Sequence, residues 1–209
     1  MRTAVFLAAA MALAMPAMAQ EAPPEGKSLF LTKTCVACHG KDGSKAILGY
    51  PNLAGLDKTY LLTQMKDIAS GARTSGKDER GYPRTQGMKD IMHLVTEAEM
   101  TTIADWLSKL PAAPLKPGTD DAARLEAGAK LYDKTNCKTC HGPQGTKPLP
   151  TYSLIAGQKK AYLAQQMIEI RDGVRANGRV KAMVPNVKNL TDDDIGLLAD
   201  FLSSVQVKK

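Results

Sequence analysis

One pentapeptide pattern, Cys-x-x-Cys-His, occurs twice in this chain and accounts for all four of its cysteines. In such a pattern two neighbouring thiols can each add to one vinyl group of a porphyrin, and the adjacent imidazole can bind the iron, so the pattern is the attachment signature of c-type haem. The sequence therefore predicts two covalently attached haems. The attachment residues are Cys35 and Cys38 in the first copy and Cys137 and Cys140 in the second, with His39 and His141 as axial iron ligands.

Two other uses of paired cysteines fit this sequence less well. A four-thiolate zinc site usually has its two Cys-x-x-Cys pairs about 15–20 residues apart, whereas here Cys137 follows Cys35 by 102 residues. A thioredoxin-like dithiol needs a strand-rich context, and the segments around both motifs have helical spacing and Gly/Pro loops. Haem attachment remains the favoured interpretation.

Residues 1–19 are typical of a cleaved signal peptide. Arg2 supplies a short positive region, an apolar stretch follows, and Ala17 and Ala19 flank Met18 in a small-x-small cleavage pattern. A retained membrane anchor is the alternative, but the apolar stretch is short for a span of about 20 residues. We therefore expect export to the periplasm, with the mature chain beginning at Gln20.

The charge of the chain favours acidic partners. The net charge is +7 for the full sequence and +6 once Arg2 is removed, which suits binding to acidic proteins or anionic surfaces. Lysines flank both haem motifs. No cluster of Lys and Arg is interleaved with aromatic residues, so a nucleic-acid partner is not expected. The flanking lysines are Lys33, Lys41, Lys134, Lys138 and Lys147.

The chain contains an internal repeat of two similar halves. The offset of 102 residues that relates the cysteines also relates Gly26 to Gly128 and Arg73 to Arg175. Beyond that point the offset falls to 95, because residues 75–81 form a polar insert in the first half, which we interpret as a surface loop. Repeats of this length indicate tandem domains. Further repeated positions are Leu29 and Leu131, Ala54 and Ala156, Gly55 and Gly157, Tyr60 and Tyr162, Gln64 and Gln166, Gly71 and Gly173, and Asp105 and Asp200.

A proline-rich segment separates the two copies and predicts the domain boundary. Residues 111–119 include three prolines and form a semi-rigid connector. The predicted domains are 20–110 and 120–209. Each is small for an independent core, so a bound haem would supply part of the apolar interior.

Each copy predicts the same order of helices and no convincing strand, so the fold class is all-α. A short helix precedes the haem motif, and a second helix covers residues 58–69 in the first half and 160–171 in the second. The last helix begins at a capping signal, Thr96 with Glu99 or Thr191 with Asp194, although a capping box prefers Glu or Gln at the second position.

One methionine in each half has the position expected of the sixth iron ligand. Met88 and Met183 each precede the capping threonine by eight residues, in a predicted loop before the last helix. A thioether there would give His/Met ligation, which raises the reduction potential. Met92 and His93 are rivals in the first half, but neither is repeated in the second.

The proximal histidines need a partner for the second ring nitrogen, usually a carbonyl. Pro51 lies twelve residues after His39, and the equivalent residue after His141 is Ser153. A backbone carbonyl is available at either position, and we expect the two loops to differ in stiffness because only one of them has proline.

With these motifs and their repeated counterparts, the chain resembles the dihaem cytochromes of the c4 type, in which two class I cytochrome c domains follow one another. The resemblance covers the whole mature chain. It implies two domains related by a pseudo-twofold axis, one covalent haem c in each, haem propionates approaching each other at the interface, and periplasmic electron transfer to terminal oxidases. The insert at residues 75–81 and Ser153 depart from the pattern.

We expect a monomeric electron carrier or relay between an upstream donor and an acidic terminal oxidase or reductase, associated with the membrane surface through its partner. No paired carboxylates or activated serine indicate an enzyme. The alternative is the dihaem electron-accepting subunit of a periplasmic dehydrogenase that oxidises sulfide or thiosulfate. A dihaem peroxidase is a third interpretation. It needs a five-coordinate haem, and Met88 and Met183 argue against that.

Overall fold

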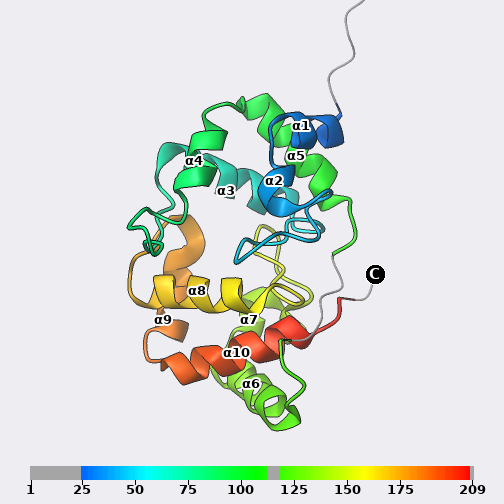
Figure 1. The fold of residues 1–209 in the computed structure, drawn as a ribbon. Coiled ribbons are helices and arrows are strands. Elements are labelled where there is room, and N and C mark those ends of the chain that lie inside the picture. Colours follow the sequence, from blue (N-terminus) through cyan, green and yellow to red (C-terminus); the bar gives the residue numbers. More distant parts are fainter. Residues whose placement is uncertain (1–24, 113–117, 208–209) are drawn as a thin grey trace, which may run out of the picture.

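The computed structural model describes residues 25–112 and 118–207, which form two helical halves stacked one above the other (Figure 1). These residues contain no strand, only an isolated bridge between Lys77 and Pro83, so the all-α prediction is confirmed. None of their helices has the length and apolar character needed to cross a membrane. The predicted signal peptide and residues 113–117 of the predicted linker lie outside the described residues.

The two halves repeat one arrangement of helices. In the first half α1 and α3 pack on α5, and in the second α6 and α8 pack on α10. The first half comprises α1 (Gly26–Thr32), α2 (Val36–His39), α3 (Lys58–Ser70), α4 (Gln86–Met92) and α5 (Glu97–Ser108). The second comprises α6 (Ala122–Lys134), α7 (Lys138–His141), η1 (Pro143–Gly145), α8 (Lys160–Arg171), η2 (Gly178–Met183), α9 (Val184–Val187) and α10 (Asp192–Ser204).

A glycine permits the close crossing of the first and last helix in each half. A Cβ atom on Gly26 would lie 2.4 Å from the Cβ of Trp106, and one on Gly128 would lie 2.2 Å from the carbonyl oxygen of Leu197. Neither distance is compatible with a side chain. The repeat of Gly26 as Gly128 is therefore explained by helix packing.

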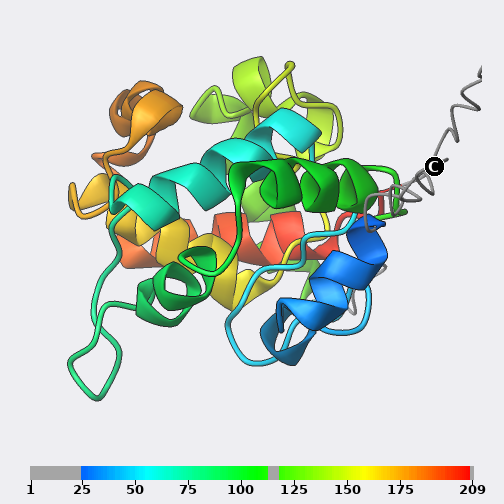
Figure 2. The same ribbon diagram turned by 90° about the horizontal axis from the view of Figure 1, so that it is seen from above.

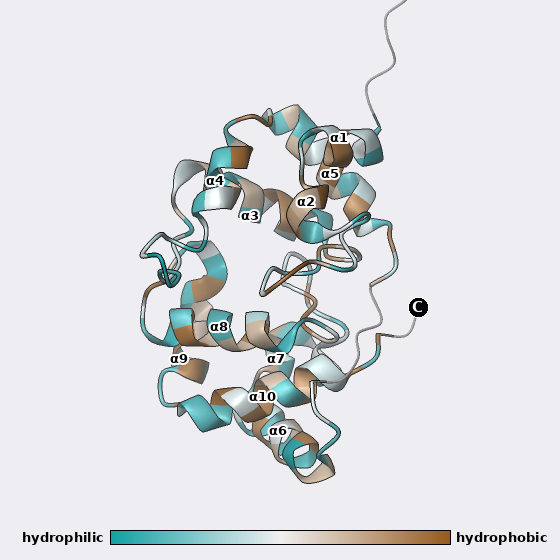
Figure 3. Cartoon of the chain, in the orientation of Figure 1, coloured by the Kyte–Doolittle hydropathy of each residue, from teal (hydrophilic) through white to brown (hydrophobic). Residues whose placement is uncertain are grey.

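Each half has its own apolar core. Figure 3 shows apolar residues mixed with polar ones around the long helices, as expected for helices that bury one face. Phe30 is fully buried in the first core, with its ring centroid 5.3 Å from that of Trp106. The second core repeats this contact with Tyr132 and Phe201, at 5.8 Å. The repeat therefore preserves the aromatic pair as well as the haem motif.

The last helices begin where the sequence predicts. Thr96 with Glu99 and Thr191 with Asp194 both form complete capping boxes, so the shorter aspartate serves as well as glutamate here. The prediction that Met88 and Met183 lie in loops was wrong. Met88 lies within α4, and Met183 ends the 3-10 helix η2. These helices of six or seven residues are too short to show a clear apolar period.

A buried polar network joins the two halves. Arg73 and Arg175 are 9% and 5% exposed, and each guanidinium donates to the side-chain oxygens of both Gln64 and Gln166 at 2.7–3.0 Å. Arg73 also donates to the hydroxyl of Tyr162. The repeated Arg and Gln positions are thus interface residues, arranged reciprocally as a pseudo-twofold relation requires.

The insert is not only a surface loop. Seen from above, the loop that contains it projects from one side of the molecule (Figure 2). At its base, however, the backbone N–H of Gly76 donates to Glu169 of α8, which is 3% exposed. Reciprocally, the side-chain amide of Asn177 in the second half donates to the carboxylate of Asp67 in the first half at 2.5 Å. Each half therefore docks the segment after its arginine onto a carboxylate of the other half.

Candidate haem-binding sites

The haem motifs form two single-turn helices, α2 and α7. Each is followed by a glycine in a left-handed conformation, Gly40 at φ 75° and Gly142 at φ 72°. A Cβ on Gly142 would lie 2.1 Å from the carbonyl oxygen of Lys147, so glycine allows the chain to fold back beside the motif. All four cysteines are partly buried, and none of them forms a disulfide.

Burial favours the neutral form of two of these thiols, those of Cys35 and Cys137. It raises the pKa of Cys35 to about 11, and it raises the pKa of Cys137 as well, although a hydrogen bond between Cys137 and Thr135 opposes the shift. Neutral thiols at the edge of an apolar pocket suit bonding to a hydrophobic ligand better than they suit a thiolate metal site. The described residues include no group of three or more His, Cys, Asp or Glu that could hold a metal ion, so a four-thiolate zinc site is not assembled.

Both proximal histidines have one ring nitrogen fixed by a backbone carbonyl. Nδ1 of His39 donates to the carbonyl oxygen of Pro51 at 2.9 Å, and Nδ1 of His141 donates to that of Ser153 at the same distance. Burial lowers the pKa of both imidazoles, so the neutral form with its proton on Nδ1 is favoured. Nε2 then carries a lone pair suitable for iron.

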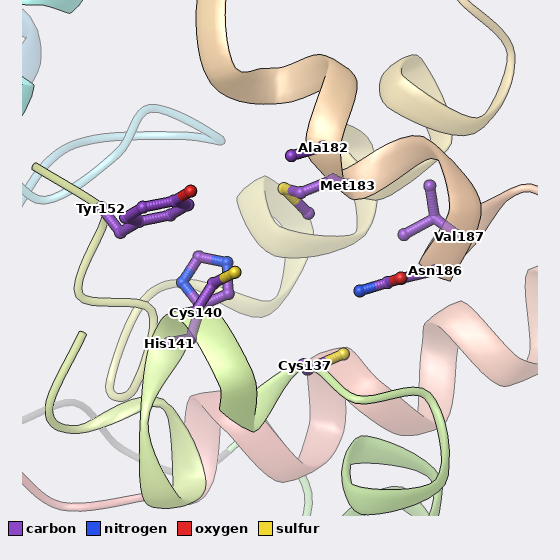
Figure 4. A pocket seen from close by; sticks show the side chains of 8 residues that line it. All are labelled: Cys137, Cys140, His141, Tyr152, Ala182, Met183, Asn186 and Val187. Atoms are coloured by element: carbon purple, nitrogen blue, oxygen red, sulfur yellow. The ribbon is translucent and has the colours of Figure 1, made fainter. Parts of the chain in front are cut away.

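The second half contains a pocket between its histidine and its methionine (Figure 4). The buried Nε2 of His141 has no hydrogen-bond partner within the described part of the chain, which is an unfavourable state for a buried polar atom unless a ligand completes it. The residues lining this pocket are Cys137, Cys140, His141, Tyr152, Ala182, Met183, Asn186 and Val187.

In the first half, two of the corresponding residues, Cys35 and Met88, contact one core cluster. Met88 is partly buried and packs against the core cluster that Cys35 also contacts. Met92 is 2% exposed within that core, and its counterpart Val187 lines the pocket of the second half, so Met92 occupies a packing position. His93 is exposed at the end of α4. The assignment of Met88 over these two rivals stays a prediction.

These observations fit haem. In the second half one pocket brings together two thiols, an imidazole nitrogen that has no hydrogen-bond partner among the described residues, and a thioether. The sequence of the first half repeats these residue types as Cys35, Cys38, His39 and Met88. When bound, haem supplies an iron that changes between the ferric and ferrous states by one electron.

Comparison with known proteins decides the family. The sequence profile of cytochrome c matches twice, over residues 24–111 and 125–206. The chain belongs to the cytochrome c family. Within it, the chain is a dihaem cytochrome of the c4 type that carries two covalently bound haem c groups. It is 31% identical to cytochrome c4 of Azotobacter vinelandii over 82% of this chain and 84% of that protein.

Other relatives support the same family. The chain is 30% identical to a thiosulfate dehydrogenase electron acceptor of Stutzerimonas stutzeri, over 96% of this chain and 94% of that protein. Among solved structures, the reduced cytochrome c4 of Pseudomonas stutzeri matches with a TM-score of 0.69 and 25% identity, over 87% of this chain and 97% of that one. The tandem arrangement of cytochrome c domains is therefore confirmed.

The sequence analysis missed the residues that join the halves at the haem loops. Gln158 and Lys159, just before α8, bond to the loop that follows α2. Neither residue is repeated, since the equivalent positions hold Leu56 and Asp57. The only feature of the sequence that could have indicated Gln158 and Lys159 is that these two adjacent polar residues have no equivalent in the first copy.

Proposed function

We propose that this cytochrome is a periplasmic carrier that passes single electrons between a respiratory donor and a terminal oxidase or reductase. The observation that carries the ligand assignment is the buried, unpartnered Nε2 of His141 in the same pocket as Met183. We assign His141 with Met183, and His39 with Met88, as the axial ligands of the two haems. Cys35, Cys38, Cys137 and Cys140 are the attachment residues.

The surrounding groups hold these ligands in place. The carbonyls of Pro51 and Ser153 orient the imidazoles through Nδ1. Soft sulfur on the opposite side stabilises ferrous iron and so raises the potential. With a histidine and a methionine both bound to each iron, neither haem would offer an open position to a substrate, which favours electron transfer over catalysis such as peroxide turnover.

A second function has specific support. Two curated relatives are thiosulfate dehydrogenase electron acceptors, and a thiosulfate dehydrogenase structure from Marichromatium purpuratum matches with a TM-score of 0.71 and 25% identity, although the chain spans only 40% of that protein. The alternative is therefore an electron-accepting subunit for a thiosulfate-oxidising enzyme. Purification from the native source without a catalytic partner, and no reduction by a thiosulfate dehydrogenase, would count against it.

Export and domain boundaries belong to the same proposal. Cleavage after Ala19 places the mature chain in the periplasm, where haem c attachment occurs. The domains are 20–110 and 120–209, joined by residues 111–119, and the two profile matches at 24–111 and 125–206 support this division. The intact mass of the protein from a periplasmic extract tests both cleavage and haem number.

A spectroscopic redox titration of the purified protein is the deciding experiment. We expect a mass equal to the mature chain plus two haems, a thioether–iron charge-transfer band, and two one-electron waves. A mass that corresponds to only one haem would contradict the dihaem assignment. Bis-histidine spectra or a five-coordinate haem would overturn the ligand assignment, and peroxide turnover would favour an enzyme.

A further inference from the structure

A lysine of the second half bonds to the loop between α2 and α3 of the first half, which directly follows the haem motif. Lys159 is the residue before α8, and its Nζ donates to two backbone carbonyls in the first half, those of Ala46 at 2.6 Å and Leu48 at 2.5 Å. Leu48 has a left-handed backbone with φ 45°. The ammonium group thus binds at a strained point of the loop between α2 and α3.

This loop is bonded directly to the haem motif. The N–H of Ile47, which lies between the two carbonyls bound by Lys159, donates to the carbonyl of Cys38 at 2.9 Å. Further along, the carbonyl of Pro51 accepts the bond from His39. Both the attachment turn and the proximal histidine therefore depend on the position of this loop.

The residue before the lysine holds the other end of the loop. Gln158, 6% exposed, accepts from the N–H of Asn52 and donates to the carbonyl of the same residue, both at 2.9 Å. Asn52 follows Pro51 directly. Gln158 and Lys159 together clamp the loop on both sides of Pro51.

The second haem has no equivalent clamp. The positions matching Lys159 and Gln158 hold Asp57, whose carboxylate caps α3 by accepting from Tyr60, and Leu56, which is buried in its own core. The first half does contact the matching loop, but through the hydroxyl of Tyr60 at Ser153 and by apolar packing of Leu154. No lysine or arginine takes the place of Lys159 there in the described interface.

A fixed cation near a haem acts on its redox equilibrium. Ferric haem carries one more positive charge than ferrous haem, so a nearby ammonium disfavours the oxidised form and raises the potential.

We propose that Lys159 raises the reduction potential of the first-half haem selectively, through its charge and its hold on the loop that positions His39. The inference rests on the proposed haem ligation. It makes the second half a determinant of the first haem's potential, so the two potentials are set partly at the domain interface.

Substitution of the lysine tests the proposal in the intact dihaem protein. In Lys159→Met we expect the equilibrium constant for reduction of the first haem to fall about threefold or more, which is about 28 mV at 59 mV per tenfold for a one-electron couple. The reduction potential of the second haem should not change. The two waves are distinguished by the displacement of the second-half wave in Met183→Ala.

Three further variants separate charge from structure. Lys159→Gln retains a donor but no charge and should lower the same wave, and it decides the matter if Lys159→Met does not fold. Lys159→Arg should restore the potential. Lys130→Met removes one exposed charge from α6 of the same half and should leave both waves in place. An unmoved first wave in Lys159→Gln, a joint shift of both waves, or an equal shift in Lys130→Met would overturn the inference.

The measurements distinguish failure of the haem-ligand assignment from failure of the role proposed for Lys159. The mass of each variant gives its haem count, and the thioether–iron band reports methionine ligation before any potential is compared. Loss of haem or of that band in the unsubstituted protein contradicts the proposed function. Normal haem content and ligation with no selective shift contradicts only the role of Lys159.

Discussion

Arg73 and Arg175, one from each half, donate to the same two glutamine oxygens across the domain interface. Both guanidinium groups are almost completely buried. Two like charges are tolerated at this place because each has acceptors from both halves and because the buried carboxylate of Glu169 lies nearby. The interface is therefore a cooperative polar unit more than an apolar contact.

Removal of either arginine should weaken the interface strongly. We expect Arg73→Gln and Arg175→Gln each to reduce the free energy of unfolding by about 3 kcal/mol, because buried partners are left unsatisfied. The double variant should lose less than the two single losses together, since both side chains bond to Gln64 and Gln166. Denaturant unfolding measures this double-mutant cycle. Arg84→Gln, at an exposed position, is the control, and strict additivity would contradict the shared network.

A methyl group at the helix crossing should destabilise the second half. In Gly128→Ala the new Cβ would lie 2.2 Å from the carbonyl oxygen of Leu197, so α6 and α10 must separate, at a cost of about 1–3 kcal/mol. Gly196→Ala is a matched control in α10, where the Cβ would find only Arg124, at 3.6 Å, and helix propensity should stabilise it slightly. Thermal unfolding followed by circular dichroism compares them. Equal effects would disprove the close-crossing explanation.

The ion pairs of Asp200 should make stability depend on pH. Burial would raise the pKa of this fully inaccessible carboxyl, but hydrogen bonds from Lys160 and Arg124 outweigh it and leave the pKa below its ordinary value of 3.8. A depressed folded-state pKa contributes stability above the unfolded pKa and loses it as pH falls through the folded value. Asp200→Asn should therefore cost about 2 kcal/mol near neutral pH and progressively less below pH 4.

The equivalent residue in the first half provides the control for this effect. Asp105 pairs with Lys58 and Lys109, but its side chain is 38% exposed. Exposed pairs contribute little, so Asp105→Asn should change stability far less at every pH. Denaturant titrations at neutral and acidic pH compare the two variants. A pH-independent loss in Asp200→Asn would refute the linkage.

The methionine assignments predict independent spectral losses. Met88→Ala and Met183→Ala should each remove half of the thioether–iron charge-transfer band and lower the potential of one haem only, because sulfur stabilises ferrous iron. Met92→Ala is the matched control, since Met92 lies in the first core. If Met92→Ala halves the band and Met88→Ala leaves it intact, the first-half assignment is wrong.

Docking to a redox partner should depend on ionic strength. Lys41, Lys134 and Lys147 are exposed beside the haem motifs, whereas Lys33 and Lys138 are paired with Glu99 and Asp133. A positive surface facing an acidic partner raises association rates by about 10- to 1000-fold at low salt. Stopped-flow electron transfer to a terminal oxidase should slow steeply as salt rises. A flat rate would mean that the lysines only maintain solubility.

The sequence predicted the repeated features well because each has a local signature. The haem motifs, the capping boxes at Thr96 and Thr191, and the helices beginning at Lys58 and Lys160 can all be identified within a short window. Gly26 and Gly128 were found as a repeat, but their reason, the helix crossing, needed the structure.

Contacts between the halves could not be predicted in the same way. The bond between Gly76 and Glu169 joins residues 93 positions apart, and that between Lys159 and Ala46 joins residues 113 apart. No local pattern encodes such pairs. The short helix α4 was also missed, because its seven residues show too little periodicity to separate it from a loop.

The Arg–Gln arrangement also bears on how such a chain arose. Each half supplies one guanidinium and one amide to the interface, so two copies of either half would satisfy the same set of bonds across a twofold axis. A single-haem ancestor could have formed a homodimer through these residues, and gene duplication with fusion would then have needed only a connector. Later divergence would be free at positions such as Lys159, outside the shared set.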